Sequence, residues 1–136
     1  MKATDLMIGD WVKIKGHLDY DKVQEISRDE NMQWYISFAC SVTLFRAYEF
    51  EPVPLTPEIL EKNGFGFVKS YDIRSVWNGQ WIYKGLELAT CCLDREGNWP
   101  CFINIDDSNI KCEYVHQLQH ALRLCKLDEL ADNFNI

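Results

Sequence analysis

Two histidines near the C-terminus, His116 and His120, have the spacing that comes closest to a chemical motif in this chain. In the zinc-peptidase pattern H-E-x-x-H, two histidines four apart on a helix bind zinc, and the glutamate acts as base on the bound water. Here Gln117 stands at the glutamate position. An amide cannot take a proton from water at neutral pH, so we predict no catalytic residue and no metal site.

The helix that carries these histidines is expected to run from Tyr114 to about Leu124. At 100° per residue its apolar side chains form one stripe, and its polar side chains gather on the opposite side. We therefore expect the polar side to face solvent or a partner, with Cys112 one turn earlier as the nearest further metal ligand. This polar side comprises His116, Gln119, His120 and Arg123.

Two tryptophans flank an Asn-Gly dipeptide at Trp77-Asn78-Gly79-Gln80-Trp81. Asn-Gly favours the tight turn of a two-residue hairpin, so the two rings are expected to pair across it. Strand aromatics of this kind pack in cores or form a stacking surface for a base or a partner. We take Trp77 and Trp81, together with His116, His120 and Arg123, as the candidate ligand or partner surface.

Charge and composition limit the classes of partner. The 136 residues are 47% hydrophobic and carry a net charge of −7, with basic residues dispersed singly among acidic ones. Duplex nucleic acid is disfavoured because no basic face is evident. No apolar run approaches the ~20 residues that span a bilayer, and the N-terminus lacks the features of a signal peptide, so we expect a cytoplasmic protein with no membrane association. The six cysteines lack C-x-x-C spacing and are expected to be reduced.

Residues 1–53 read as short strands separated by turns, which predicts an antiparallel, SH3-like small β-barrel. The expected strands are Trp11–Lys15, Lys22–Ser27, Met32–Phe38 and Val42–Phe50. Pro52-Val53-Pro54 interrupts this pattern and predicts a boundary.

Residues 54–136 read as a second, α+β unit. Thr56 is a good helix N-cap, Pro57 fits the first helical position, and Asn63-Gly64 predicts the end of that helix. About four antiparallel strands should follow, including a hairpin of Leu86–Leu93 with Trp99–Ile105. The long helix then closes the unit, with a further helical turn at Leu127–Ala131 and a frayed tail from Asp132. The predicted fold class is therefore α+β throughout.

Three stretches, Lys2–Val12, Val53–Phe65 and Tyr114–Cys125, carry a family resemblance in this order. They resemble small uncharacterised proteins of Bacteroides-type gut bacteria and of their phages and mobile elements. The resemblance covers about a quarter to a third of the chain. It implies a bacterial or phage cytosolic origin, and it implies no activity, no cofactor and no functional residue.

These observations predict a non-enzymatic binding or adaptor protein of a mobile element or prophage that acts through a protein partner and needs no cofactor. A small-ligand binder, such as a nucleotide-sequestering protein, is the alternative. A metal-dependent hydrolase built on His116 and His120 is the remote one. The identity of the partner and the oligomeric state lie beyond the sequence.

Overall fold

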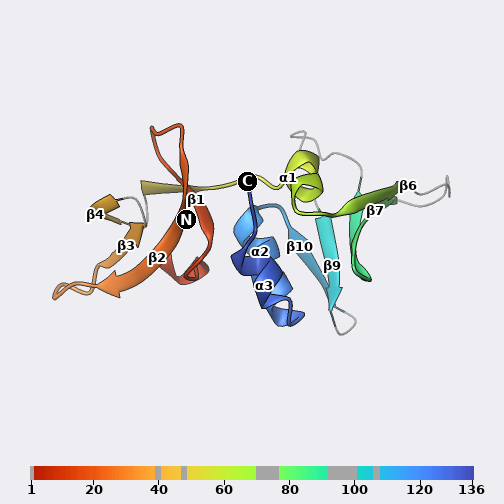
Figure 1. Ribbon diagram of the computed structural model, residues 1–136. Coiled ribbons are helices and arrows are strands. Elements are labelled where there is room, and N and C mark those ends of the chain that lie inside the picture. The colour runs from red at the N-terminus through yellow and green to blue at the C-terminus, as the bar shows by residue number, and fades with distance from the viewer. Residues whose placement is uncertain (1, 39–40, 47–48, 70–76, 92–100, 106–107) are drawn as a thin grey trace. The chain divides into compact units, whose positions relative to one another are not determined.

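A computed structural model describes residues 2–38, 41–46, 49–69, 77–91, 101–105 and 108–136 (Figure 1). The chain divides into two compact units, Met1–Val53 and Pro54–Ile136. Each unit holds one antiparallel five-stranded sheet, and helices accompany both, so the α+β class is confirmed.

The first unit is a short 3-10 helix followed by a meandering sheet. Strand β1 lies between β2 and β5, so the sheet order is β4-β3-β2-β1-β5. The pairing of β2 with β3 shifts register between Val23 and Glu25. The elements are η1 (Ala3–Asp5), β1 (Trp11–Ile14), β2 (Tyr20–Arg28), β3 (Trp34–Phe38), β4 (Ser41–Arg46) and β5 (Phe50–Pro52).

The core of the first unit shows that this sheet is strongly curled. Phe45 and Phe50 come from β4 and β5, at opposite ends of the strand order, yet their ring centroids are 6.1 Å apart. Phe38 contacts both rings, at 5.6 Å and 5.3 Å. Among the described residues no ladder joins β4 to β5, so closure into a barrel is not observed.

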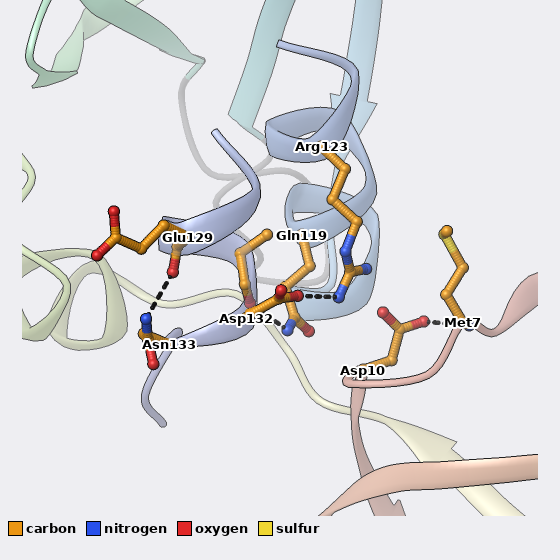
Figure 2. A network of polar contacts seen from close by, with 8 residues as sticks. Met7, Asp10, Gln119, Arg123, Glu129, Asp132 and Asn133 are labelled. Carbon is orange, nitrogen blue, oxygen red and sulfur yellow. Dashed lines mark hydrogen bonds and ion pairs between the residues drawn. The ribbon is translucent and has the colours of Figure 1, made fainter. Parts of the chain in front are cut away.

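The turn before β1 is built on a buried carboxylate. Asp10 is 0% exposed, and its side chain accepts a 2.7 Å hydrogen bond from the backbone N–H of Met7 (Figure 2). Gly9 precedes it at φ +89°, a conformation that favours glycine. This local arrangement directs the chain into β1.

The second unit packs helices against a sheet of order β10-β9-β8-β7-β6. Five strands are present where about four were expected. None of the helices in the described ranges is long and apolar enough to cross a membrane. The elements are α1 (Pro57–Lys62), β6 (Gly66–Lys69), β7 (Trp77–Tyr83), β8 (Leu86–Cys91), β9 (Cys101–Ile105), β10 (Ser108–Cys112), α2 (Val115–Leu124) and α3 (Asp128–Asp132).

Helix α1 begins and ends where its capping residues predict. The Thr56 hydroxyl accepts a hydrogen bond from the Ile59 N–H at 3.4 Å, and Pro57 occupies the first turn. Hydrogen bonds from its own backbone N–H and from Thr56 lower the pKa of Glu58. Gly64 follows the helix at φ +81°, which confirms the predicted stop.

The C-terminal residues are packed, and the prediction of a frayed tail is wrong. Phe134 is 0% exposed. Asn63, which caps α1, donates to the Asn135 carbonyl at 2.7 Å, and its own side-chain carbonyl accepts from the Asn135 N–H at 2.8 Å. A tail of polar sequence is therefore ordered by one buried ring and by hydrogen bonds from a distant helix end.

The predicted hairpin at Asn78-Gly79 is also wrong. Both residues lie inside β7, which runs unbroken from Trp77 to Tyr83 with an irregularity in its pairing between Trp77 and Gly79. The chain turns instead at Lys84-Gly85, where φ is +46° and +89°. The hairpin of β8 with β9 is present, and its connecting residues 92–100 lie outside the described ranges.

Candidate functional site

Gln117, which replaces the base of the zinc-peptidase pattern, caps the start of α2. Its side-chain oxygen accepts hydrogen bonds from the backbone N–H groups of Glu113 at 2.8 Å and of Tyr114 at 3.2 Å. These are N–H groups at the helix start that otherwise need a partner. The residue therefore has a structural task that is independent of any metal chemistry.

His116 and His120 lie side by side on α2, one turn apart. Their ring centroids are 5.9 Å apart in an edge-to-face arrangement, and Tyr114 stacks on His116 at 5.9 Å. His116 is 6% exposed, so it does not have the exposure expected of a side chain that faces solvent or a partner, whereas His120 is half-buried. The pair forms an aromatic row with Tyr114 rather than an open chelating pair.

Helix α3 explains why part of the polar side of α2 is covered. Gln119 is 0% exposed, and its amide donates to the Ala131 carbonyl of α3 at 2.9 Å. Arg123 reaches the Asp132 carboxylate, also on α3, at 3.2 Å, and its side chain is only 13% exposed (Figure 2). The outward orientation predicted for this side fails for Gln119 because a second short helix packs there.

Trp81 does not lie on the surface, although the prediction required it to. Trp81 is 5% exposed and packs against Phe67 of β6, with ring centroids 5.0 Å apart. Its cross-strand row continues through Leu88 to Ile103, which is 0% exposed, so Trp81 lies on the buried face of the sheet. Trp77 belongs to the same strand, and its side chain lies outside the described residues.

The described side chains do not assemble a metal centre: no group of three or more His, Cys, Asp or Glu is placed to hold an ion in those ranges. Cys112 lies in β10 directly opposite Cys101, and both are buried free thiols. Burial, with a smaller contribution from Cys101, raises the pKa of the Cys112 thiol to about 12. It is therefore a poor ligand and a poor nucleophile at neutral pH.

Strand β6 is the surface that the sequence reasoning missed. All four of its residues are exposed, including Phe67 at 44% and Val68 at 53%. It lies at the end of the sheet order, with β7 as its one strand neighbour in the described part of the chain (Figure 1). Two adjacent apolar residues before a lysine were the available signal, but only the strand order shows that they lie at an edge.

A glycine holds Phe67 in place. A Cβ atom at Gly79 would lie 2.5 Å from Cζ of Phe67 and 2.6 Å from the Val68 carbonyl oxygen. The Phe67 ring therefore lies over the bare backbone of β7, beside Trp81. This contact fixes the side chain at the edge while leaving nearly half of it exposed.

Comparison with protein-family models, with curated proteins and with solved structures finds no match for this chain.

Proposed function

We propose that this chain is a non-enzymatic binding protein that captures an extended segment of a protein partner along strand β6. The observation that carries the proposal is the exposure of all four residues of this edge strand, Phe67 and Val68 among them. An edge strand presents unpaired N–H and C=O groups that can pair with a further strand. We further propose that the chain is an adaptor of a bacterial mobile element or prophage; the resemblance bears only on this origin and not on the role.

The side chains of β6 define the chemistry of the partner. Successive residues of a strand point to opposite faces, so Phe67 lies on the Trp81 face and Val68 on the other. Lys69 adds a positive charge on the Phe67 face. The matching segment is extended, carries apolar side chains on both faces, and has an acidic residue near the position that meets Lys69.

We propose that the first unit has the SH3-like architecture predicted from the sequence; the contact of Phe45 with Phe50 supports this, whereas among the described residues no ladder joins β4 to β5 to close a barrel. We propose that the interaction takes place in the cytoplasm.

Selection of peptides from a random library displayed on phage tests the proposal. Peptides of about eight residues, enriched on the full chain, should bind the Val68→Lys variant at least about tenfold more weakly, because edge lysines oppose strand pairing. Leu124→Lys is the matched control: it changes the charge equally at a residue that is 67% exposed on α2. That variant should bind like the unaltered chain.

Backbone methylation separates strand pairing from simple apolar contact. Methylating alternate amides of a selected peptide should abolish binding in one of the two alternating sets and spare it in the other. Equal tolerance of both sets, or equal affinity for Val68→Lys, would contradict the proposal. A concentration-dependent dimer that Val68→Lys dissociates would instead assign this edge to a second copy of the chain.

A further inference from the structure

A pocket of about 320 Å³ lies where the turn after β7 meets the joint between α2 and α3. Two lysines line it, together with an aromatic ring, two apolar side chains, a carboxylate and an amide. The lining residues are Tyr83, Lys84, Lys126, Leu127, Glu129, Leu130 and Asn133.

Both lysines adopt a backbone conformation that favours glycine. Lys84 has φ +46° and Lys126 has φ +61°. Within the described ranges Met32 is the one other non-glycine residue with positive φ, and it lies in the first unit. A Cβ atom is unfavourable in this region, so a lysine there destabilises the turn relative to glycine.

The two local structures are ones in which glycine is the usual residue. Lys84-Gly85 joins β7 to β8 as a two-residue turn, whose first position prefers Asn, Asp or Gly. Lys126 follows the C-terminus of α2, where the Leu127 N–H donates to the Leu122 carbonyl at 2.9 Å. A helix end of this kind usually has glycine at the left-handed position. The pocket is thus lined by a lysine at two positions where glycine is usual, the β7–β8 turn and the end of α2.

The aromatic ring of the pocket packs on a core residue. The Tyr83 ring packs on Phe65, which is 3% exposed, with ring centroids 5.2 Å apart. The Lys84 ammonium lies 5.3 Å from the centre of the Tyr83 ring. In the described part of the chain neither Lys84 nor Lys126 forms an ion pair. Both cations are exposed and therefore available to a ligand in the pocket.

We infer that this pocket binds a small anion with a flat apolar portion, such as a nucleoside monophosphate. Lys84 and Lys126 would hold the anionic group, while Tyr83, Leu127 and Leu130 would contact the flat portion. The two cations outnumber the Glu129 carboxylate, so the pocket is locally positive within a chain of net charge −7. This site is independent of the β6 edge.

Titration of the ¹⁵N-labelled full chain with adenosine 5′-monophosphate tests the inference. The nucleotide should shift the amide signals of Lys84, Gly85, Lys126 and Leu127 in a saturable way. The double variant Lys84→Gly/Lys126→Gly should bind at least about tenfold more weakly. Its melting temperature should equal or exceed that of the unaltered chain, because glycine relieves both positive-φ positions.

Controls make each alternative visible. Lys15→Asn removes an exposed lysine of the first unit and should leave the Kd unchanged. Unshifted amides, an unchanged Kd in the double variant, or a lower melting temperature of that variant would overturn the inference. If inorganic phosphate binds as tightly as the nucleotide, the pocket does not recognise a flat apolar portion. If adenosine binds as tightly as the nucleotide, the pocket does not recognise the anionic group.

Discussion

The two edge strands of the second sheet differ in what covers them. At one edge, β10 contacts α2, and directly after it the Glu113 carbonyl accepts a 2.9 Å hydrogen bond from the Leu55 N–H. At the other edge, every residue of β6 is exposed. The same sheet thus has one edge that contacts a helix and ends in the buried residue Cys112, and one edge whose residues are all exposed. Stability should depend on the first and recognition on the second.

The largest expected effect concerns the pH dependence of stability at the covered edge. Burial raises the pKa of Cys112 from 9.0 to about 12, so the folded state favours the protonated thiol. The protonated Cys112 thiol makes its full contribution to the unfolding free energy below pH 9. This contribution is lost as the pH rises from 9 to 12, because the unfolded chain loses the thiol proton in this range before the folded chain does. The loss should reach about 4 kcal/mol at pH 12, at 1.36 kcal/mol per pKa unit.

Urea denaturation across this pH range measures the effect. Cys112→Ala should show a shallower decline in unfolding free energy between pH 9 and 12 than the unaltered chain, since the other titrating groups are common to both. Equal slopes would mean that the Cys112 thiol is not protected by the covered edge.

The next effect is a cavity beneath α2. Leu118 is 0% exposed, so Leu118→Ala should lower the unfolding free energy by about 3 kcal/mol. Leu124 lies on the same helix and is 67% exposed, and Leu124→Ala should change it by less than about 0.5 kcal/mol. Chemical denaturation of both variants compares them, and similar losses would contradict the placement of α2.

A smaller effect is expected where the open edge rests on its neighbour. Gly79→Ala would place a Cβ 2.5 Å from Phe67, and should destabilise the unit by about 2 kcal/mol. Gly66→Ala is the matched control because a Cβ there meets no atom within 4 Å. Thermal unfolding distinguishes the two, and an unperturbed Gly79→Ala variant would show that the Phe67 ring does not need this space.

The smallest effect belongs to the open edge itself. Val68→Lys should alter the unfolding free energy by no more than about 0.5 kcal/mol, because Val68 is 53% exposed. A loss of several times that amount in denaturant titrations would show that β6 is held by contacts in the core, and would erase the contrast between the two edges.

Local signals predicted those parts of the fold that local contacts determine. The cap at Thr56, the proline after it and the glycine at 64 specify α1 because each acts within one helical turn. Asn78-Gly79 misled for the opposite reason: Gly79 is needed where the ring of Phe67 crosses β7, a contact between residues twelve apart. The turn preference of a dipeptide contains no information about a side chain from a neighbouring strand that packs over it.

Exposure was harder to predict than secondary structure. The helical period correctly placed Leu118 and Leu122 in the core, but His116 and Gln119 are buried as well. The covering of Gln119 depends on α3, five residues long, whose packing no periodicity reveals. The β6 edge and the lysine pocket were missed for the same reason. The first depends on the order of strands in the sheet and the second on a turn and a helix end that are distant in the sequence.

The Phe67–Gly79 contact also determines the register in which a partner peptide could pair with β6. A shift of β6 by one residue would move Phe67 to the opposite face and leave the bare backbone of Gly79 uncovered. The strand is therefore held in one frame, with Phe67 opposite Trp81. An incoming peptide would inherit that frame, so its odd and even positions would face different chemical surroundings, and a permuted sequence of the same composition would not fit.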